Sequence, residues 1–150
     1  MIKGKAFLRT EQTEDQIKKI IEFFGGPKEE DLIGIAKAHE IAQSTKKVKP
    51  KKLESIFTKC PKELIDMLNK MFLYKPTNRL TAMENMAHPF CDDLRNKELC
   101  SNNGKFMVPN IFNFTEEEIS ESRQRNLWAK IIPDWSDGHK NLLSFINSSQ

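Results

Sequence analysis

Apolar residues recur at helical spacing near the start of the chain. From about Glu14 to Phe24 they fall on one face of a predicted helix, and they are Ile17, Ile20, Ile21 and Phe24. Thr13 and Gln16 have the spacing of a capping box at its beginning, and Gly25-Gly26-Pro27 ends it. This apolar face can be ordinary core, which we favour, or can receive an amphipathic helix of a partner.

A second periodic stretch follows a less regular region. We expect a short helix near Glu29 to Ile41 and a short segment at Leu53–Phe57. The next helix begins after Cys60, with Pro61 at the tolerated first position, and covers Lys62–Leu73. Its apolar residues are Leu64, Met67, Leu68 and Met71. We interpret this methionine-bearing stripe as core rather than as a binding groove.

The stretch from Tyr74 to Arg95 is the most informative part of the chain. A proline-containing turn stops the preceding helix and presents Arg79. Thr81 and Glu84 then form a capping box for a short helix, which Pro89 ends one turn later. Turn, cap and stop therefore predict two helices joined by a fixed corner.

The same kind of signal returns near the C-terminus. Thr115 and Glu118 form another capping box, and the preceding Phe112 and Phe114 alternate as anchors of an extended stretch.

Composition excludes several classes of protein without choosing a function. The 150 residues carry a net charge of +3 and are enough for one domain or part of one. We see no apolar run of about 18 residues and no secretory signal, and expect a cytoplasmic or nuclear protein without a membrane span. Cys60, Cys91 and Cys100 have no zinc or disulfide spacing, so we expect reduced thiols and no metal site.

Positive charge is concentrated at Lys46–Lys52. Such a run can attract nucleic acid, acidic lipid or an import receptor, but it is more often a solvated loop. No aromatic residue interrupts it to stack on a base, so we do not expect nucleic-acid binding.

Several motifs together resemble the end of a eukaryotic protein kinase catalytic domain. They are Leu80-Thr81-Ala82, Ala87-His88-Pro89-Phe90, Asp93-Leu94-Arg95 and Phe112-Asn113-Phe114-Thr115. The phrase is most similar to the glycogen synthase kinase-3 (shaggy) branch of the serine/threonine kinases, in the CMGC group. The resemblance implies an all-α fold, the helical rear part of a kinase large lobe with an irregular C-terminal extension. It implies a partial large lobe at residues 4–95, a kinase C-terminal extension at 96–133 and a tail of unknown order at 134–150.

The resemblance also implies structural roles for four residues. In kinases the arginine that matches Arg79 forms a buried ion pair with the glutamate of the Ala-Pro-Glu motif. His88, Pro89 and Phe90 match a structural turn. The glutamate is absent here, so Arg79 turns to solvent, pairs with a substitute such as Glu84, or meets a carboxylate supplied by a missing kinase half.

The catalytic parts of a kinase are not found in these residues. The sequence contains no Gly-x-Gly-x-x-Gly, His-Arg-Asp, Asp-Phe-Gly or Ala-Pro-Glu motif. The intact family uses ATP and magnesium to phosphorylate protein serine or threonine, but we assign no catalytic, cofactor-binding or metal residue here and predict the chain alone to be inactive. It is either the C-terminal fragment of such a kinase or a non-catalytic helical module that binds kinase partners.

The resemblance also bears on partners. Related kinases bind scaffold proteins such as axin in an apolar groove beside the helix that follows the activation segment. This chain instead has Ala38–Thr45 and the lysine run, so we do not expect an axin-like partner. The expected partner is the missing kinase half, or another protein that covers exposed helices.

Overall fold

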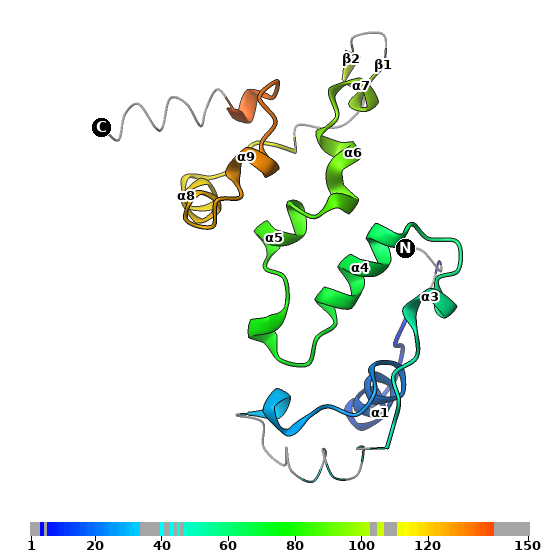
Figure 1. Cartoon of the computed structure of the whole chain (residues 1–150). Coiled ribbons are helices and arrows are strands. Elements are labelled where there is room, and N and C mark those ends of the chain that lie inside the picture. Colours follow the sequence, from blue (N-terminus) through cyan, green and yellow to red (C-terminus); the bar gives the residue numbers. More distant parts are fainter. Residues whose placement is uncertain are drawn as a thin grey trace. The chain divides into compact units, whose positions relative to one another are not determined.

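The computed structural model describes residues 4, 6–33, 40, 43, 45, 47–102, 105–106 and 111–139. The chain divides into two compact units, residues 1–79 and residues 80–150. Short helices joined by turns make up both units (Figure 1), so the all-α fold class is confirmed. The sequence ranges 4–95, 96–133 and 134–150 concern similarity to kinases rather than packing, and they stay predictions.

The first unit contains three α-helices and two 3-10 turns in its described part. They are α1 (Thr13–Phe24), η1 (Glu29–Leu32), α3 (Leu53–Ile56), α4 (Lys62–Met71) and η2 (Pro76–Asn78). Leu53, Phe57 and Ile65 are buried together at the centre of this unit. Burying side chains of this size contributes roughly 1.5–3 kcal/mol each to the stability of the unit.

The predicted helix starts differ from the structure by one residue. The N-cap of α1 is Gln12, without a side-chain cap, so α1 starts one residue earlier than predicted. The side chain of Thr13, on which the predicted Thr13–Gln16 capping box depends, lies outside the described part. Pro61 is the N-cap of α4 rather than its first residue. Near Glu29 the chain forms the turn η1, and Glu40 is helical. Residues 34–39 and 41 of the helix predicted at Glu29 to Ile41 lie outside the described part.

The apolar stripe of α4 is rotated from the predicted one. Ile65 is its buried residue, whereas Met71 is exposed. Leu68 packs on the same cluster as Ile65, and the Phe72 ring lies 4.9 Å from that of Phe24. The spacing 65, 68 and 72 is equally helical. Aromatic partners far away in sequence select this face, and they could not be seen from the helix alone.

The second unit is a succession of short helices with one small hairpin. Its elements are α5 (Ala82–Met86), η3 (Pro89–Cys91), α6 (Asp92–Arg95), α7 (Lys97–Cys100), β1 (Ser101–Asn102), β2 (Lys105–Phe106), α8 (Glu116–Gln124) and α9 (Trp128–Ile131). β1 and β2 pair antiparallel, with Ser101 opposite Phe106. The core joins α5, α8 and α9 through Met83, Ala87, Ile119, Ile131 and Ile132.

Helix α5 ends earlier than predicted. α5 stops at Met86, and Pro89 begins the next turn rather than ending the helix. The cause is the residue before the proline: the proline ring disfavours helical backbone at His88, which takes φ −67° and ψ 145°.

The segment that the sequence left unplaced is packed as far as His139. The Trp135 ring stands edge-on to the Phe112 ring at 5.4 Å. Ser136 is buried, and a Cβ added to Gly138 would lie only 1.9 Å from the carbonyl oxygen of Phe112. Residues 134–139 therefore pack against the extended stretch that contains Phe112. In the described part of the chain, no helix is long and apolar enough to cross a membrane.

Candidate functional site

Side-chain hydrogen bonds to backbone carbonyl groups of the first unit hold the turn after α4 in place. The hydroxyl of Tyr74 donates to the carbonyl oxygen of Gly25 at 2.6 Å. Burial raises the pKa of Tyr74 to about 12, and the negative charge of Asp31 adds to the effect. Gly25 ends α1 with φ 81°, a conformation that glycine adopts without strain. The contact therefore ties the turn to the end of α1.

Arg79 completes this turn. Its Nε donates to the carbonyl oxygen of Leu73 at 2.6 Å, and its Nη2 donates to that of Tyr74 at 3.2 Å. The side chain is exposed, and no carboxylate in the described part of the chain pairs with it. Glu84, the substitute partner considered above, caps Thr81 and pairs with Arg125 instead. The guanidinium group is thus oriented by the protein while part of it stays open to solvent.

The α1 face is only partly available. Ile21 is buried, and Phe24 packs on the unit's core and on Phe72. Ile17 is 41% exposed, and Ile20 is half-buried. Most of the predicted face is therefore core, which leaves a narrow surface around Ile17.

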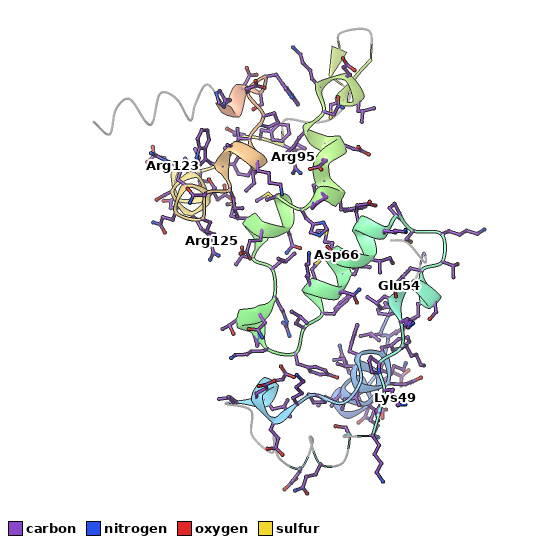
Figure 2. The ribbon with its side chains drawn as sticks, viewed as in Figure 1. Lys49, Glu54, Asp66, Arg95, Arg123 and Arg125 are labelled. Atoms are coloured by element: carbon purple, nitrogen blue, oxygen red, sulfur yellow. The ribbon has the colours of Figure 1, made fainter. Side chains whose placement is uncertain are left out.

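One lysine of the basic run contacts the end of α1. Lys51 pairs with Glu22, and its ammonium group lies 4.7 Å from the centre of the Phe23 ring. The hydrogen bond and charge of Lys51 lower the pKa of Glu22. Lys49, labelled in Figure 2, is exposed, as is Lys47. The described residues of the run form a loop with part of its charge already paired.

The capping box of α5 is formed as the sequence predicts. The Thr81 hydroxyl accepts from the Glu84 amide at 3.3 Å, and the Glu84 carboxylate accepts from the Thr81 amide at 2.8 Å. The backbone hydrogen bond from Thr81 lowers the pKa of Glu84. Glu84 also lies 3.5 Å from Arg125, just beyond the end of α8. This carboxylate therefore links two helices of the second unit.

His88 and its two neighbours form a tight corner. His88 is buried, and its Nδ1 accepts a hydrogen bond from the Phe90 amide at 3.3 Å. Pro89 occupies the first position of η3, whereas the ring of Phe90 is exposed. The imidazole therefore caps the start of η3. The described residues bring no group of three His, Cys, Asp or Glu side chains together for a metal.

Arg95 organises the corner, although the sequence assigned it no role. Its guanidinium group donates to the carbonyl oxygens of Met86 and His88 and pairs with Asp92. The side chain is only 13% exposed, and Figure 2 labels it in the second unit. Its own carbonyl oxygen accepts from Trp135 Nε1 at 2.9 Å. The only sequence signal for this role was that Arg95 lies in the kinase-like motif Asp93-Leu94-Arg95.

A shallow hollow of about 470 Å³ lies against α3 and α4. Phe57 and Ile65 contribute apolar surface, and Glu54 and Asp66, labelled in Figure 2, contribute carboxylates. Asp66 also pairs with Lys70 at 2.6 Å. Cys60 and Lys62 also line the hollow.

Comparison with known proteins gives these features a context. No protein-family model matches the chain. It is 33% identical over 126 residues to Protein kinase gsk3 of Schizosaccharomyces pombe, which covers 79% of this chain and 32% of that protein. Glycogen synthase kinase 3 of Trypanosoma brucei brucei is 27% identical over 120 residues, covering 79% and 34%. Glycogen synthase kinase 1 of Pyricularia oryzae is 29% identical over 129 residues, covering 82% and 32%.

These similarities relate the chain to protein kinases, and its capped helical corner is consistent with part of a kinase large lobe. More narrowly, it is a homologue of the glycogen synthase kinase-3 kinases. The chain spans about a third of the length of these relatives.

Proposed function

We propose that this chain is the helical base of a kinase large lobe and that the protein it belongs to transfers the γ-phosphoryl group of ATP to protein serine or threonine. The single observation that carries the proposal is the 33% identity over 126 residues to a protein kinase. In that protein, ATP and magnesium would be held by residues outside this chain, since none here matches a phosphate-binding or metal-binding motif.

The role of the chain in this proposal is to hold a rigid corner. The Thr81–Glu84 cap fixes the start of α5, and the Arg95 guanidinium fixes the carbonyl groups at its end. Charged groups that satisfy buried carbonyls in this way are costly to remove, because each carbonyl left without a donor loses about 1–3 kcal/mol. Such a corner is suited to supporting catalytic groups supplied by other residues rather than to carrying out catalysis itself.

Arg79 is the group through which the rest of the kinase would be held. Hydrogen bonds to Leu73 and Tyr74 already orient its guanidinium group, and the side chain remains exposed. A carboxylate from the remaining kinase residues would meet a positive charge already in position. The glutamate of the family's Ala-Pro-Glu motif has the required chemistry.

An assay of the purified chain tests the catalytic half of the proposal. We expect no transfer of labelled phosphate from ATP to a peptide substrate and no saturable ATP binding. The matched comparison is the Schizosaccharomyces pombe relative under the same conditions, which supplies the positive signal. Transfer that scales with the concentration of the purified chain would overturn the assignment of catalysis to residues elsewhere.

The alternative is a stand-alone module that binds kinase partners through the α1 face. The exposure of Ile17 favours it, but Ile21 and Phe24 are used in the core of the first unit. One variant distinguishes the two proposed functions. Ile17→Glu would abolish partner binding by a module, whereas a helical base bound through Arg79 would tolerate it.

A further inference from the structure

The loop that carries the basic run is fixed to the end of α1 through its backbone. The amide of Gly26 donates to the carbonyl oxygen of Val48 at 3.0 Å, and the amide of Lys51 donates to that of Phe23 at 2.9 Å. A third hydrogen bond, from the Val48 amide to the Thr45 carbonyl oxygen at 3.0 Å, joins two positions within the loop. The described lysines of the run therefore stand on an anchored backbone.

The glycine pair that ends α1 makes room for this loop. A Cβ added to Gly26 would lie 2.1 Å from the carbonyl oxygen of Thr45, and one added to Gly25 would lie 2.9 Å from Cδ of Pro50. Contacts as short as these are sterically forbidden, so a larger side chain would displace the loop. Gly25-Gly26 thus does more than end the helix, because it also lets the basic loop pack against α1.

The described lysines of the loop divide into one that anchors it and three that are available. Lys51 pairs with Glu22 and serves as the anchor. The other three side chains are exposed, and within the part of the chain that the structure describes they form no ion pair and no hydrogen bond. We call them the loop lysines, and they are Lys47, Lys49 (labelled in Figure 2) and Lys52.

Pro50 spreads these charges along an extended backbone. The proline ring disfavours helical backbone at Lys49, and Lys52 is extended, with φ −70° and ψ 124°. From Lys49 to Lys52 the chain spans at most roughly 11 Å. Among the described residues, the amide and carbonyl groups of Lys49 have no hydrogen-bond partner. The loop therefore offers separated positive charges and open backbone groups to an extended partner.

Three classes of anion bind lysine-rich surfaces, and this loop suits one of them. A single-stranded nucleic acid needs aromatic side chains for stacking, and the run contains none. A lipid surface needs large apolar groups to insert, whereas Val48 is the one aliphatic residue of the run and is 38% exposed. An extended acidic segment of a protein needs only carboxylates that meet the ammonium groups and a backbone that meets Lys49.

We propose that the loop lysines bind an extended acidic segment of another protein. Its carboxylates pair with the three ammonium groups, and its backbone bonds to the open amide and carbonyl groups of Lys49. Because the loop is already held against α1, its backbone does not have to be ordered on binding, which favours affinity. This inference does not depend on the proposed kinase function, because it uses only contacts within the first unit.

Fluorescence anisotropy of a labelled octaglutamate peptide tests binding to the full chain at about 0.15 M salt. The test variant combines Lys47→Gln, Lys49→Gln and Lys52→Gln, all at exposed positions, so folding is preserved. We expect binding of the peptide to weaken about tenfold, because three exposed ion pairs are lost. Absence of binding to the unsubstituted chain would overturn the proposal.

A control variant removes the same charge from other exposed lysines. It combines Lys62→Gln, Lys97→Gln and Lys130→Gln. We expect peptide binding to change little in this variant, since none of these lysines belongs to the loop. Equal weakening in the two triple variants would show that net charge alone attracts the peptide, and would overturn the proposal.

Two other anions identify the class of partner. The same chain is mixed with labelled oligothymidylate and, in a sedimentation assay, with vesicles of phosphatidylcholine and phosphatidylserine. We expect both to bind more weakly than octaglutamate. Binding of either anion that is as tight as that of the peptide and depends on the loop lysines would overturn the assignment to an acidic protein segment.

Pro50→Gly tests whether the shape of the loop matters, because it retains every charge and removes the restriction on Lys49. Pro50 is exposed, so the core of the first unit is not touched. We expect binding of octaglutamate to weaken about threefold, since the loop then loses more backbone freedom on binding. Unchanged binding would overturn the claim that the fixed, extended loop is the site.

Discussion

The Tyr74 hydroxyl and the Gly25 carbonyl oxygen, 49 residues apart in sequence, form a hydrogen bond of 2.6 Å. The bond joins the turn after α4 to the end of α1. Arg79 donates to the carbonyl oxygen of the same tyrosine at 3.2 Å. The first unit thus positions the exposed guanidinium group through Tyr74, which makes the tyrosine a structural partner of the proposed contact to the rest of the kinase.

The ionisation of Tyr74 is the first testable consequence. Its pKa is raised to about 12 from an ordinary value of 10.0, chiefly because burial opposes the phenolate. The contribution to stability is therefore complete below pH 10 and is lost as pH rises toward 12. Since the chain contains one tyrosine, phenolate absorbance reports this residue alone. We expect a midpoint near 12 in the folded chain and near 10 in urea; equal midpoints would contradict the buried contact.

Removal of the α5 cap should weaken the second unit. Thr81→Ala loses the acceptor for the Glu84 amide, and the free energy of unfolding should fall by about 1 kcal/mol. Thr81→Ser keeps the hydroxyl and should retain most of that stability. Both tryptophans, Trp128 and Trp135, lie in the second unit, so urea unfolding followed by tryptophan fluorescence measures the relevant transition. An equal loss in both variants would point to lost methyl packing rather than a lost cap.

Arg95 and Trp135 should be energetically coupled. Arg95→Met leaves the carbonyls of Met86 and His88 without this donor, and we expect a loss of about 2–4 kcal/mol. Trp135→Phe removes the indole donor but keeps an aromatic ring against Phe112, and should cost about 1 kcal/mol. In a double-mutant cycle, the two losses together should differ from their sum by at least about 0.5 kcal/mol. Strict additivity would show that Trp135 packs without support from the Arg95 corner.

The end of α8 offers a test of backbone conformation. Asn126 has φ 55°, and the amide of Leu127 donates to the carbonyl oxygen of Ser122 at 2.8 Å, as in a Schellman motif. Asn126→Gly should preserve or slightly raise stability, because glycine adopts this conformation without steric cost. Asn126→Val should lower it by about 1–2 kcal/mol. Thermal melts of the two variants should bracket the unsubstituted chain; a valine variant as stable as the glycine variant would contradict the assignment.

Local signals in the sequence predicted the parts of the fold that depend on neighbours. The capping boxes at Thr81 and Thr115 form as expected because each needs only residues three positions apart. The predicted stripe of α4 correctly included Leu68 but missed Ile65 and included the exposed Met71, because Ile65 is selected by contacts with Leu53 and Phe57. The Arg95 hub was missed for the same reason, since its donors reach carbonyl groups that no residue pattern reveals.

The resemblance to kinases gave more of the functional picture than any geometric feature did. It indicated where to look for a structural arginine and histidine, and the structure then showed Arg79 oriented by Leu73 and Tyr74 and His88 buried in a corner. The contacts of the described residues give Arg79 backbone carbonyl acceptors only. Sequence and structure together therefore lead to a test in a larger protein.

The most direct test of the account is a chimera. The 126-residue match in the Schizosaccharomyces pombe relative is replaced by the corresponding part of this chain, and transfer of phosphate to a peptide substrate is measured beside Arg79→Gln and Lys75→Gln versions. We predict that the chimera is active, that Arg79→Gln loses most of the activity, and that Lys75→Gln keeps it. An inactive chimera that is folded, by tryptophan fluorescence and hydrogen exchange, would contradict the claim that this chain can serve as the base of a kinase lobe.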